Sequence, residues 1–192
     1  MADFIEQSID KIESWLSKRS FALLKSKLKT IEDEVDFDRK VVFLSLRSKP
    51  INQLYSLLHE CGHILVRSKK NFKSRFRETT AIEEGRLFVE TNRSIVEQIE
   101  EEILAWREGY KLSNQLELNL VEKEFFKYGF RWVMSYIVRG SLGKEHYLPS
   151  IESKEETNTE NRITQEELTR LLDNAHDTCY NQVISKTPTK DQ

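Results

Sequence analysis

The spacing of apolar residues along the first third of the chain predicts helices. In residues 3–18, apolar side chains recur every three or four positions from Phe4 to Leu16, which indicates an amphipathic helix. A weaker repeat of leucines favours a second helix over residues 21–31. Residues 32–38 are acidic and polar, so we expect a loop there.

The next stretch changes its pattern twice. Residues 40–47, KVVFLSLR, are β-branched and aromatic with partial alternation, which predicts one strand. Pro50 then marks a break before a helix over residues 51–67. The apolar stripe of this helix consists of Leu54, Leu57, Leu58, Cys61 and Leu65. His59 and His63 lie on a different face of the same helix.

The remaining pattern completes a prediction of α+β class, a mainly helical domain with a small β-sheet. We expect a loop or edge segment at 68–80, one or two helices over 81–116, a largely buried aromatic helix at 118–138, a linker at 141–163, a C-terminal helix at 164–186 opened by Thr164 and Glu167, and a disordered tail at 187–192. The predicted domain is 1–140, with a core of 40–140 and the outer helix 3–18.

Composition narrows the class of protein. A chain of 192 residues suits one domain, and its net charge of -2 gives no general attraction to nucleic acid or anionic membranes. The sequence has no run of about 18 apolar residues that would span a membrane. The acidic start does not match a signal peptide, and Cys61 and Cys179 form no disulfide framework. We therefore expect a cytoplasmic protein.

One pentapeptide carries recognisable chemistry: His59-Glu60-Cys61-Gly62-His63. Residues i and i+4 share a helix face, so two imidazoles at this spacing can bind one Zn²⁺. Glu60 would then lie beside the metal without binding it. There it could take a proton from zinc-bound water, whose pKa the metal lowers to roughly 7, and pass it to a leaving amine.

The alternative is a chance pentapeptide with two structural histidines. We disfavour it because the motif lies on the best-patterned helix and its histidines avoid the apolar stripe. Cys61 is about 200° around that helix from His59, at 100° per residue, and is expected to be a buried structural residue. The pattern therefore predicts a zinc-dependent hydrolase, a peptidase of the HExxH zincin class.

A catalytic zinc site needs a third protein ligand and an open position. Residues 100–102 are three consecutive glutamates. The neighbouring apolar residues Ile99, Ile103 and Trp106 should anchor this helix to the core, so one of the three acids should face the buried side. We select Glu102, with Glu101 as the alternative. Ala105, one turn later, would let two helices approach closely.

At these residues the chain resembles zincin metallopeptidases of the Glu-ligand group (gluzincins), in particular the small ImmA/IrrE-type proteins common in bacteria and their mobile elements or phages. The resemblance covers roughly residues 40–110, and rests on KVVFLSLR, LLHECGHIL and the later Glu-x-x-Ala. It implies one zinc ion bound by His59, His63 and Glu102, with Glu60 as general base. It also implies a protein substrate, such as a repressor or other regulatory protein. Trp106 stands where the family tends to have a small polar or acidic residue.

Two further features remain open. The donor that stabilises the oxyanion could be Tyr110, Tyr128, Tyr136, His146 or Tyr147. The basic stretch 67–77, RSKKNFKSRFR, could bind nucleic acid, form a substrate-recognition loop, or be a solvated loop with its phenylalanines packed down. We favour the solvated loop, because the net charge outside this stretch is acidic and no nucleic-acid-binding motif is present. The acidic stretch EQIEEEILAWRE offers a counterpart that could neutralise it. The competing functions are a catalytically silent zinc-binding regulatory protein and a nucleic-acid-binding module.

Overall fold

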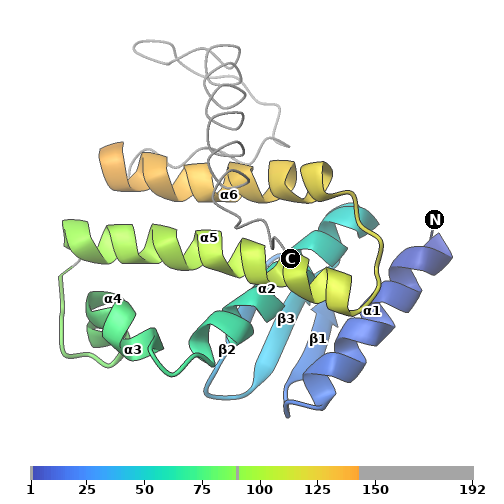
Figure 1. Ribbon diagram of the computed structural model, residues 1–192, viewed down its shortest axis with the longest axis horizontal. Coiled ribbons are helices and arrows are strands. Elements are labelled where there is room, and N and C mark those ends of the chain that lie inside the picture. The colour runs from blue at the N-terminus through green and yellow to red at the C-terminus, as the bar shows by residue number, and fades with distance from the viewer. Residues whose placement is uncertain (1, 90, 143–192) are drawn as a thin grey trace, which may run out of the picture. The chain divides into compact units, whose positions relative to one another are not determined.

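The computed structural model describes residues 2–89 and 91–142 (Figure 1). The chain divides into two units, Met1–Gly129 and Phe130–Gln192. Nearly every described element belongs to the first unit, and the described part of the second continues the last helix. Most of the predicted linker, together with the C-terminal helix 164–186 and the tail 187–192, lies outside the described residues. No described helix combines the length and apolar composition that crossing a membrane requires.

Helices dominate the described chain, and the few strands form one small sheet. In chain order the elements are α1 (Ala2–Ser17), β1 (Ala22–Ser26), β2 (Glu34–Asp36), β3 (Val41–Ser45), α2 (Pro50–Arg67), α3 (Phe72–Arg75), α4 (Arg77–Glu83), α5 (Asn92–Gln115) and α6 (Glu122–Leu142). The predicted class, α+β and mainly helical, is confirmed.

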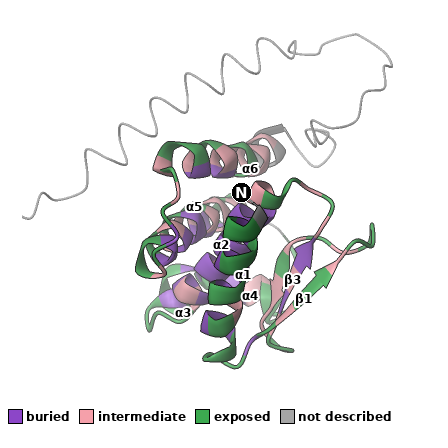
Figure 2. Cartoon of the chain, turned by 90° about the vertical axis from the view of Figure 1, so that its right-hand side faces the viewer, coloured by how far each residue is buried: buried purple, intermediate pink, exposed green. Residues whose placement is uncertain are grey.

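In the first unit, α2 lies between the sheet and α5 (Figure 1). The helix α1, predicted from its amphipathic repeat, packs beside α2 and against β1. Its buried face includes Ile5, Ile12 and Leu16, and Figure 2 shows its outer face exposed. The sheet contributes Val42 and Leu44 of β3, both fully buried. The predicted strand at 40–47 and helix at 51–67 are therefore confirmed.

The predicted helix over 21–31 is wrong, because residues 22–26 form β1 instead. This strand pairs in parallel with β3, and Leu23 lies opposite Val42. A turn at Ser20, with φ of 63°, separates it from α1. Leucine has good helix propensity, but pairing with a neighbouring strand outweighs that local preference.

The predicted loop at 32–38 is also partly wrong, because residues 34–36 form β2. This strand pairs with β3 in the antiparallel direction. It lies at one edge of the sheet, whose strand order is β1-β3-β2. The turn that follows is held by the Arg39 amide, which donates to the Asp36 carboxylate at 2.8 Å. Charged residues suit a short edge strand, so acidic composition alone did not exclude one.

The segment 68–80, predicted as a loop or edge, instead contains α3 and the start of α4. Phe72, Phe76 and Thr80 are four residues apart and all are buried. A repeat of buried residues at helical spacing was therefore present, but the surrounding Lys and Arg residues concealed it. The prediction that these phenylalanines pack down is confirmed.

The helical prediction for 81–116 resolves into the end of α4 and the whole of α5. A capping box formed by Thr91 and Ser94 begins α5. Of the expected apolar anchors, Trp106 is buried but Ile103 is 38% exposed. The buried stripe of α5 instead consists largely of acids and small residues, among them Glu97, Glu101 and Ala105.

The helix predicted at 118–138 exists as α6, but the expectation that it is largely buried is wrong for its first two turns. Within residues 122–129, the buried positions are Phe125 and Gly129. The ring of Phe125 contacts Tyr55 of α2 and Trp106 of α5, with centroids 5.3 Å apart in both pairs. Lysine and glutamate side chains occupy the exposed positions between these contacts.

Candidate metal centre

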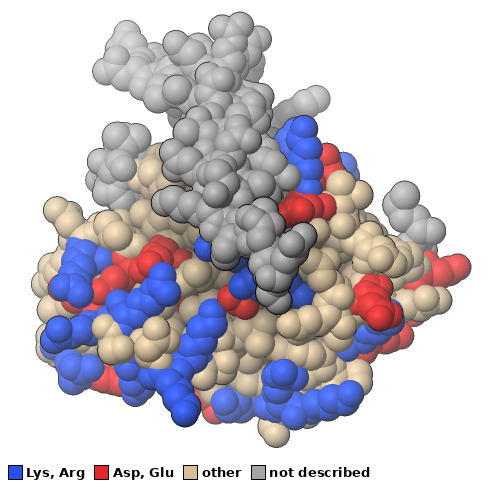
Figure 3. Space-filling model, viewed as in Figure 1, with Lys and Arg blue, Asp and Glu red and all other residues tan. Residues whose placement is uncertain are grey.

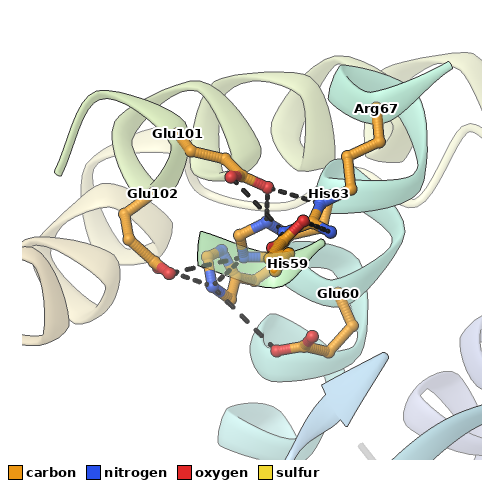
Figure 4. A network of polar contacts seen from close by, with 7 residues as sticks. His59, Glu60, His63, Arg67, Glu101 and Glu102 are labelled. Atoms are coloured by element: carbon orange, nitrogen blue, oxygen red, sulfur yellow. Dashed lines mark hydrogen bonds and ion pairs between the residues drawn. The ribbon is translucent and has the colours of Figure 1, made fainter. Parts of the chain in front are cut away.

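The two motif histidines lie one turn apart on α2 and point to the same side (Figure 4). Their Nε2 atoms are 3.2 Å apart, and their ring centroids are 4.6 Å apart. Spacing of i and i+4 on a regular helix produces this convergence, as the sequence predicted.

Glu102 of α5 completes the group from the facing helix. Its carboxylate oxygens lie 3.1 Å from the Nε2 of His59 and 3.6 Å from the Nε2 of His63. A tetrahedral ion with bonds of about 2.0 to 2.1 Å requires ligand atoms about 3.3 to 3.4 Å apart. The three side chains therefore bring two nitrogen donors and one oxygen donor to distances at which the group could hold a metal ion.

Glycine and alanine bring the two helices close enough for this convergence. A Cβ on Gly62 would lie 1.9 Å from the carbonyl oxygen of Ala105. A Cβ on Gly109 would lie 2.4 Å from the carbonyl oxygen of Leu58. The backbones of α2 and α5 are thus in direct contact on both sides of His59, at Leu58 and at Gly62. The predicted role of Ala105 in close approach agrees with this packing.

His59 is held mainly by packing. Its ring stacks on Trp106, with centroids 4.3 Å apart and planes inclined by 14°. Its Nδ1 is buried and has no hydrogen-bond partner among the described residues. Burial lowers the pKa of His59 to about 3, although the charge of Glu101 acts in the opposite direction. The imidazole is therefore neutral near pH 7, and a neutral ring can offer a nitrogen lone pair to a metal.

Glu60 lies beside the group of donors without belonging to it. Its Oε1 is 4.0 Å from the Nε2 of His59, and the residue is only 6% exposed. Burial raises its pKa well above the usual range, and the nearby carboxylates of Glu102 and Asp33 raise it further. This arrangement has a carboxylate near the donors that can hold a proton at higher pH than an exposed glutamate can.

Glu101, the alternative third ligand, faces a different atom of His63. Its Oε1 lies 3.2 Å from Nδ1, whereas the carboxylate of Glu102 lies near Nε2. Arg67 donates from Nε to the same Glu101 oxygen at 2.7 Å. Burial raises the pKa of Glu101, but contacts with His63 and Arg67 outweigh this effect and the pKa is lowered.

Sequence reasoning missed the roles of Arg67 and Trp106 in this site. Arg67 was assigned only to the basic stretch, yet it follows His63 by four residues and therefore shares its helix face. That spacing was a usable signal. The sequence indicates Trp106 as an apolar anchor at a position where the resembled family tends to have a small polar or acidic residue, but no motif indicates that its ring stacks on His59.

Three of the five proposed oxyanion donors lie in described residues. The hydroxyl of Tyr128 is 3.3 Å from the Oγ of Ser56, one turn before His59 on α2. Tyr110 contacts Phe125 and Phe126 of α6. Tyr136 belongs to the second unit, and His146 and Tyr147 lie outside the described residues.

The basic stretch 67–77 is extensively paired with acids. Lys69 contacts Glu108 at 2.9 Å, Lys73 contacts Glu84 at 2.8 Å, and Arg75 contacts Glu100 at 2.5 Å. Figure 3 shows Lys and Arg side chains lying among Asp and Glu side chains on the visible face. Two of the acids, Glu100 and Glu108, belong to the stretch EQIEEEILAWRE, as the sequence indicated. This mixed charge argues against a continuous phosphate-binding surface.

No family model, no curated protein and no solved structure matches this chain.

Proposed function

We propose that this chain is a zinc-dependent metallopeptidase that hydrolyses a peptide bond in a cytoplasmic protein substrate. The supporting observation is the convergence of His59, His63 and Glu102 beside the carboxylate of Glu60. Two imidazoles and one carboxylate are a donor set of catalytic zinc sites, which keep a further position open. We expect one zinc ion per chain.

In the proposed reaction, zinc would supply Lewis acidity that makes water easier to deprotonate and polarises the carbonyl group. Glu60 accepts a proton from the attacking water and donates it to the leaving amine. His59, His63 and Glu102 would hold the ion beside Glu60. The contact between α2 and α5 maintains this position, because both histidines come from one helix and Glu102 from the other.

A second candidate is a catalytically silent metal-binding regulatory protein. The deep burial of Glu60 and His59 favours it, because a peptide must reach both the ion and the base. The two candidates share the metal site and differ only in whether Glu60 acts on a substrate. A repressor-like or other regulatory protein remains the proposed substrate class for the first.

The test compares wild type, Glu60→Gln and His63→Ala by elemental analysis after zinc loading and removal of excess metal. We expect about one zinc per chain in the first two proteins and a large loss in His63→Ala. Proteins that bind to Glu60→Gln would then be incubated with each variant and analysed by mass spectrometry. Cleavage by wild type that is lost in Glu60→Gln supports the peptidase. Stoichiometric zinc without any Glu60-dependent cleavage favours the silent protein, and no zinc in wild type rejects both.

A further inference from the structure

The two ring nitrogens of His63 face different carboxylates. Nε2 lies 3.6 Å from Glu102 and 3.2 Å from the Nε2 of His59, within the candidate ligand group. Nδ1 lies 3.2 Å from the Oε1 of Glu101. In a neutral imidazole only one nitrogen carries a proton, so an acceptor at Nδ1 favours the tautomer whose Nε2 lone pair is free.

Glu101 is itself fixed by Arg67 (Figure 4). The guanidinium donates from Nε to Oε1 at 2.7 Å and from Nη2 to Oε2 at 3.4 Å. The Glu101 side chain is only 5% exposed, which limits the competition of water for these contacts. A buried carboxylate with two partners at defined positions has little freedom to turn away from His63.

Arg67 is in turn held from a third helix. It donates from Nη2 to Glu83 of α4 at 2.7 Å, and a second contact from Nη1 measures 3.2 Å. Its guanidinium carbon also lies 4.4 Å from the ring centroid of Phe37. The series His63, Glu101, Arg67 and Glu83 therefore connects α2, α5 and α4.

We propose that Glu101 is a positioning residue for metal binding: it accepts a hydrogen bond from the Nδ1 of His63, and Arg67 holds it in place for this role. This inference rests on the metal site of the proposed function and not on peptidase activity. Carboxylate partners on the remote nitrogen of a ligand histidine fix the tautomer and ring orientation, and their loss weakens metal affinity about 10- to 100-fold.

Two other roles for Glu101 make different predictions. If Glu101 were a direct ligand, its removal would reduce affinity as much as removal of Glu102. Its position beside Nδ1, away from the converging Nε2 atoms, argues against this role. If Glu101 served only the ion pair with Arg67, its removal would lower thermal stability and leave the zinc affinity of the folded protein unchanged.

The experiment measures zinc affinity of the full chain by competition with a chelating indicator. We expect Glu101→Ala to weaken affinity by about 10- to 100-fold and Glu101→Gln by about tenfold. The amide oxygen of glutamine can still accept the Nδ1 hydrogen bond, but it lacks the charge that strengthens it. Glu100→Gln is the matched control, because its partly exposed neighbouring carboxylate pairs with Arg75 and should not affect affinity. Glu102→Gln shows how much zinc affinity is lost when a direct ligand is removed.

A tautomer measurement tests the same proposal without metal. Long-range ¹⁵N NMR of the metal-free wild type should show His63 protonated at Nδ1, with an increase in the Nε2-protonated form in Glu101→Ala. If Glu101→Ala does not fold, the isosteric Glu101→Gln still tests affinity. Affinities of the folded Glu101 variants within twofold of wild type, or a loss equal to that of Glu102→Gln, would overturn the proposal, as would an Nε2-protonated His63 in the wild type. Wild type without zinc binding but with Nδ1-protonated His63 would reject the proposed function while retaining the tautomer assignment.

Discussion

The crossing of α2 and α5 and the neighbouring segment α3–α4 are built differently. At the crossing, Gly62 and Gly109 allow backbone to meet backbone, and no side chain can be added without displacement. The segment α3–α4 instead rests on a small apolar cluster containing Phe72 and Phe76. Its surface is covered by ion pairs such as that between Lys73 and Glu84.

This difference indicates where the position of the metal donors is fixed. Direct backbone contact leaves few alternative arrangements, since a shift of either helix changes the distance from Glu102 to both histidines. Exposed ion pairs contribute only about 0 to 1 kcal/mol each and tolerate rearrangement. We therefore expect the crossing to control metal binding, and α3–α4 to affect mainly stability, except at Glu83, which contacts Arg67.

The largest expected effect is that of Gly62→Ala. In an exposed helix this change would stabilise by about 1 kcal/mol, because alanine has better helix propensity. Here the new Cβ would meet the carbonyl oxygen of Ala105 at 1.9 Å, so the helices must separate. We expect a loss of about 4 kcal/mol or more in the free energy of unfolding, together with loss of zinc binding. Chemical denaturation and elemental analysis measure the two effects.

Gly85→Ala is the control for this prediction. Gly85 has a φ of 68°, but an added Cβ there would meet no atom within 4 Å. It should cost about 1 kcal/mol from backbone strain and leave zinc binding intact. Equal effects of the two substitutions would show that the close helix contact does not determine the site.

Lowering the pH should reduce the free energy of unfolding of the metal-free protein, because His59 is buried at the crossing of α2 and α5. The folded pKa of about 3 lies below the ordinary value of 6.5, so the unfolded chain binds more protons between these values. The His59 contribution to stability is therefore complete above pH 6.5, and it falls as pH decreases toward 3. Through His59 the free energy of unfolding changes by at most about 1.4 kcal/mol per pH unit. Between the two pKa values this amounts to a few kcal/mol.

The protonation of Glu60 affects stability in the opposite direction, so its contribution must be measured separately from that of His59. Its raised pKa means that the folded protein binds the extra proton, so this contribution increases as pH falls toward its ordinary value of 4.5. The free energies of unfolding of wild type, His59→Gln and Glu60→Gln would be measured by chemical denaturation from pH 4 to 8, a range of about four units. An acid-side slope that is the same in wild type and His59→Gln would contradict the assignment to His59.

A smaller effect, confined to stability, is expected for Phe76→Ala. Phe76 is 1% exposed and packs in the cluster with Val66 and Phe72. Removing a buried aromatic ring costs about 3 kcal/mol or somewhat more. Zinc affinity of the folded variant should change less than in the Glu101 variants. Phe88→Ala, at a residue that is 91% exposed, should change stability by less than about 0.5 kcal/mol.

The sequence predicted those elements whose local pattern agrees with their packing. The amphipathic repeat of α1, the β-branched run of β3 and the apolar stripe of α2 all point to their observed state. The region 22–36 was missed because its strands depend on pairing with β3, a contact between residues distant in sequence. The helix α3 and the start of α4 were missed because charged residues conceal the repeat of Phe72 and Phe76.

The candidate ligand group was predictable for a different reason. Helical spacing alone places His59 beside His63, and a search for a carboxylate on a second helix led to Glu102. The same reasoning could not separate Glu101 from Glu102 by burial, because the more buried acid, Glu101, faces Nδ1 and Arg67. Which nitrogen a carboxylate meets depends on how α5 is rotated against α2, and no single-helix pattern encodes that rotation.

The smallest effect is expected for Lys73→Gln, and it tests the surface of α3–α4. The Lys73 side chain is 78% exposed, and its contact with Glu84 is an exposed ion pair. Its loss should change the free energy of unfolding by less than about 0.5 kcal/mol and leave zinc affinity unchanged.

Because the basic stretch is balanced by acids, neither wild type nor Lys73→Gln should show salt-dependent binding to DNA or RNA, as measured by fluorescence anisotropy. Binding by wild type that decreases in Lys73→Gln would restore a nucleic-acid role for residues 67–77, and it would show that this segment has a function beyond the support of α2.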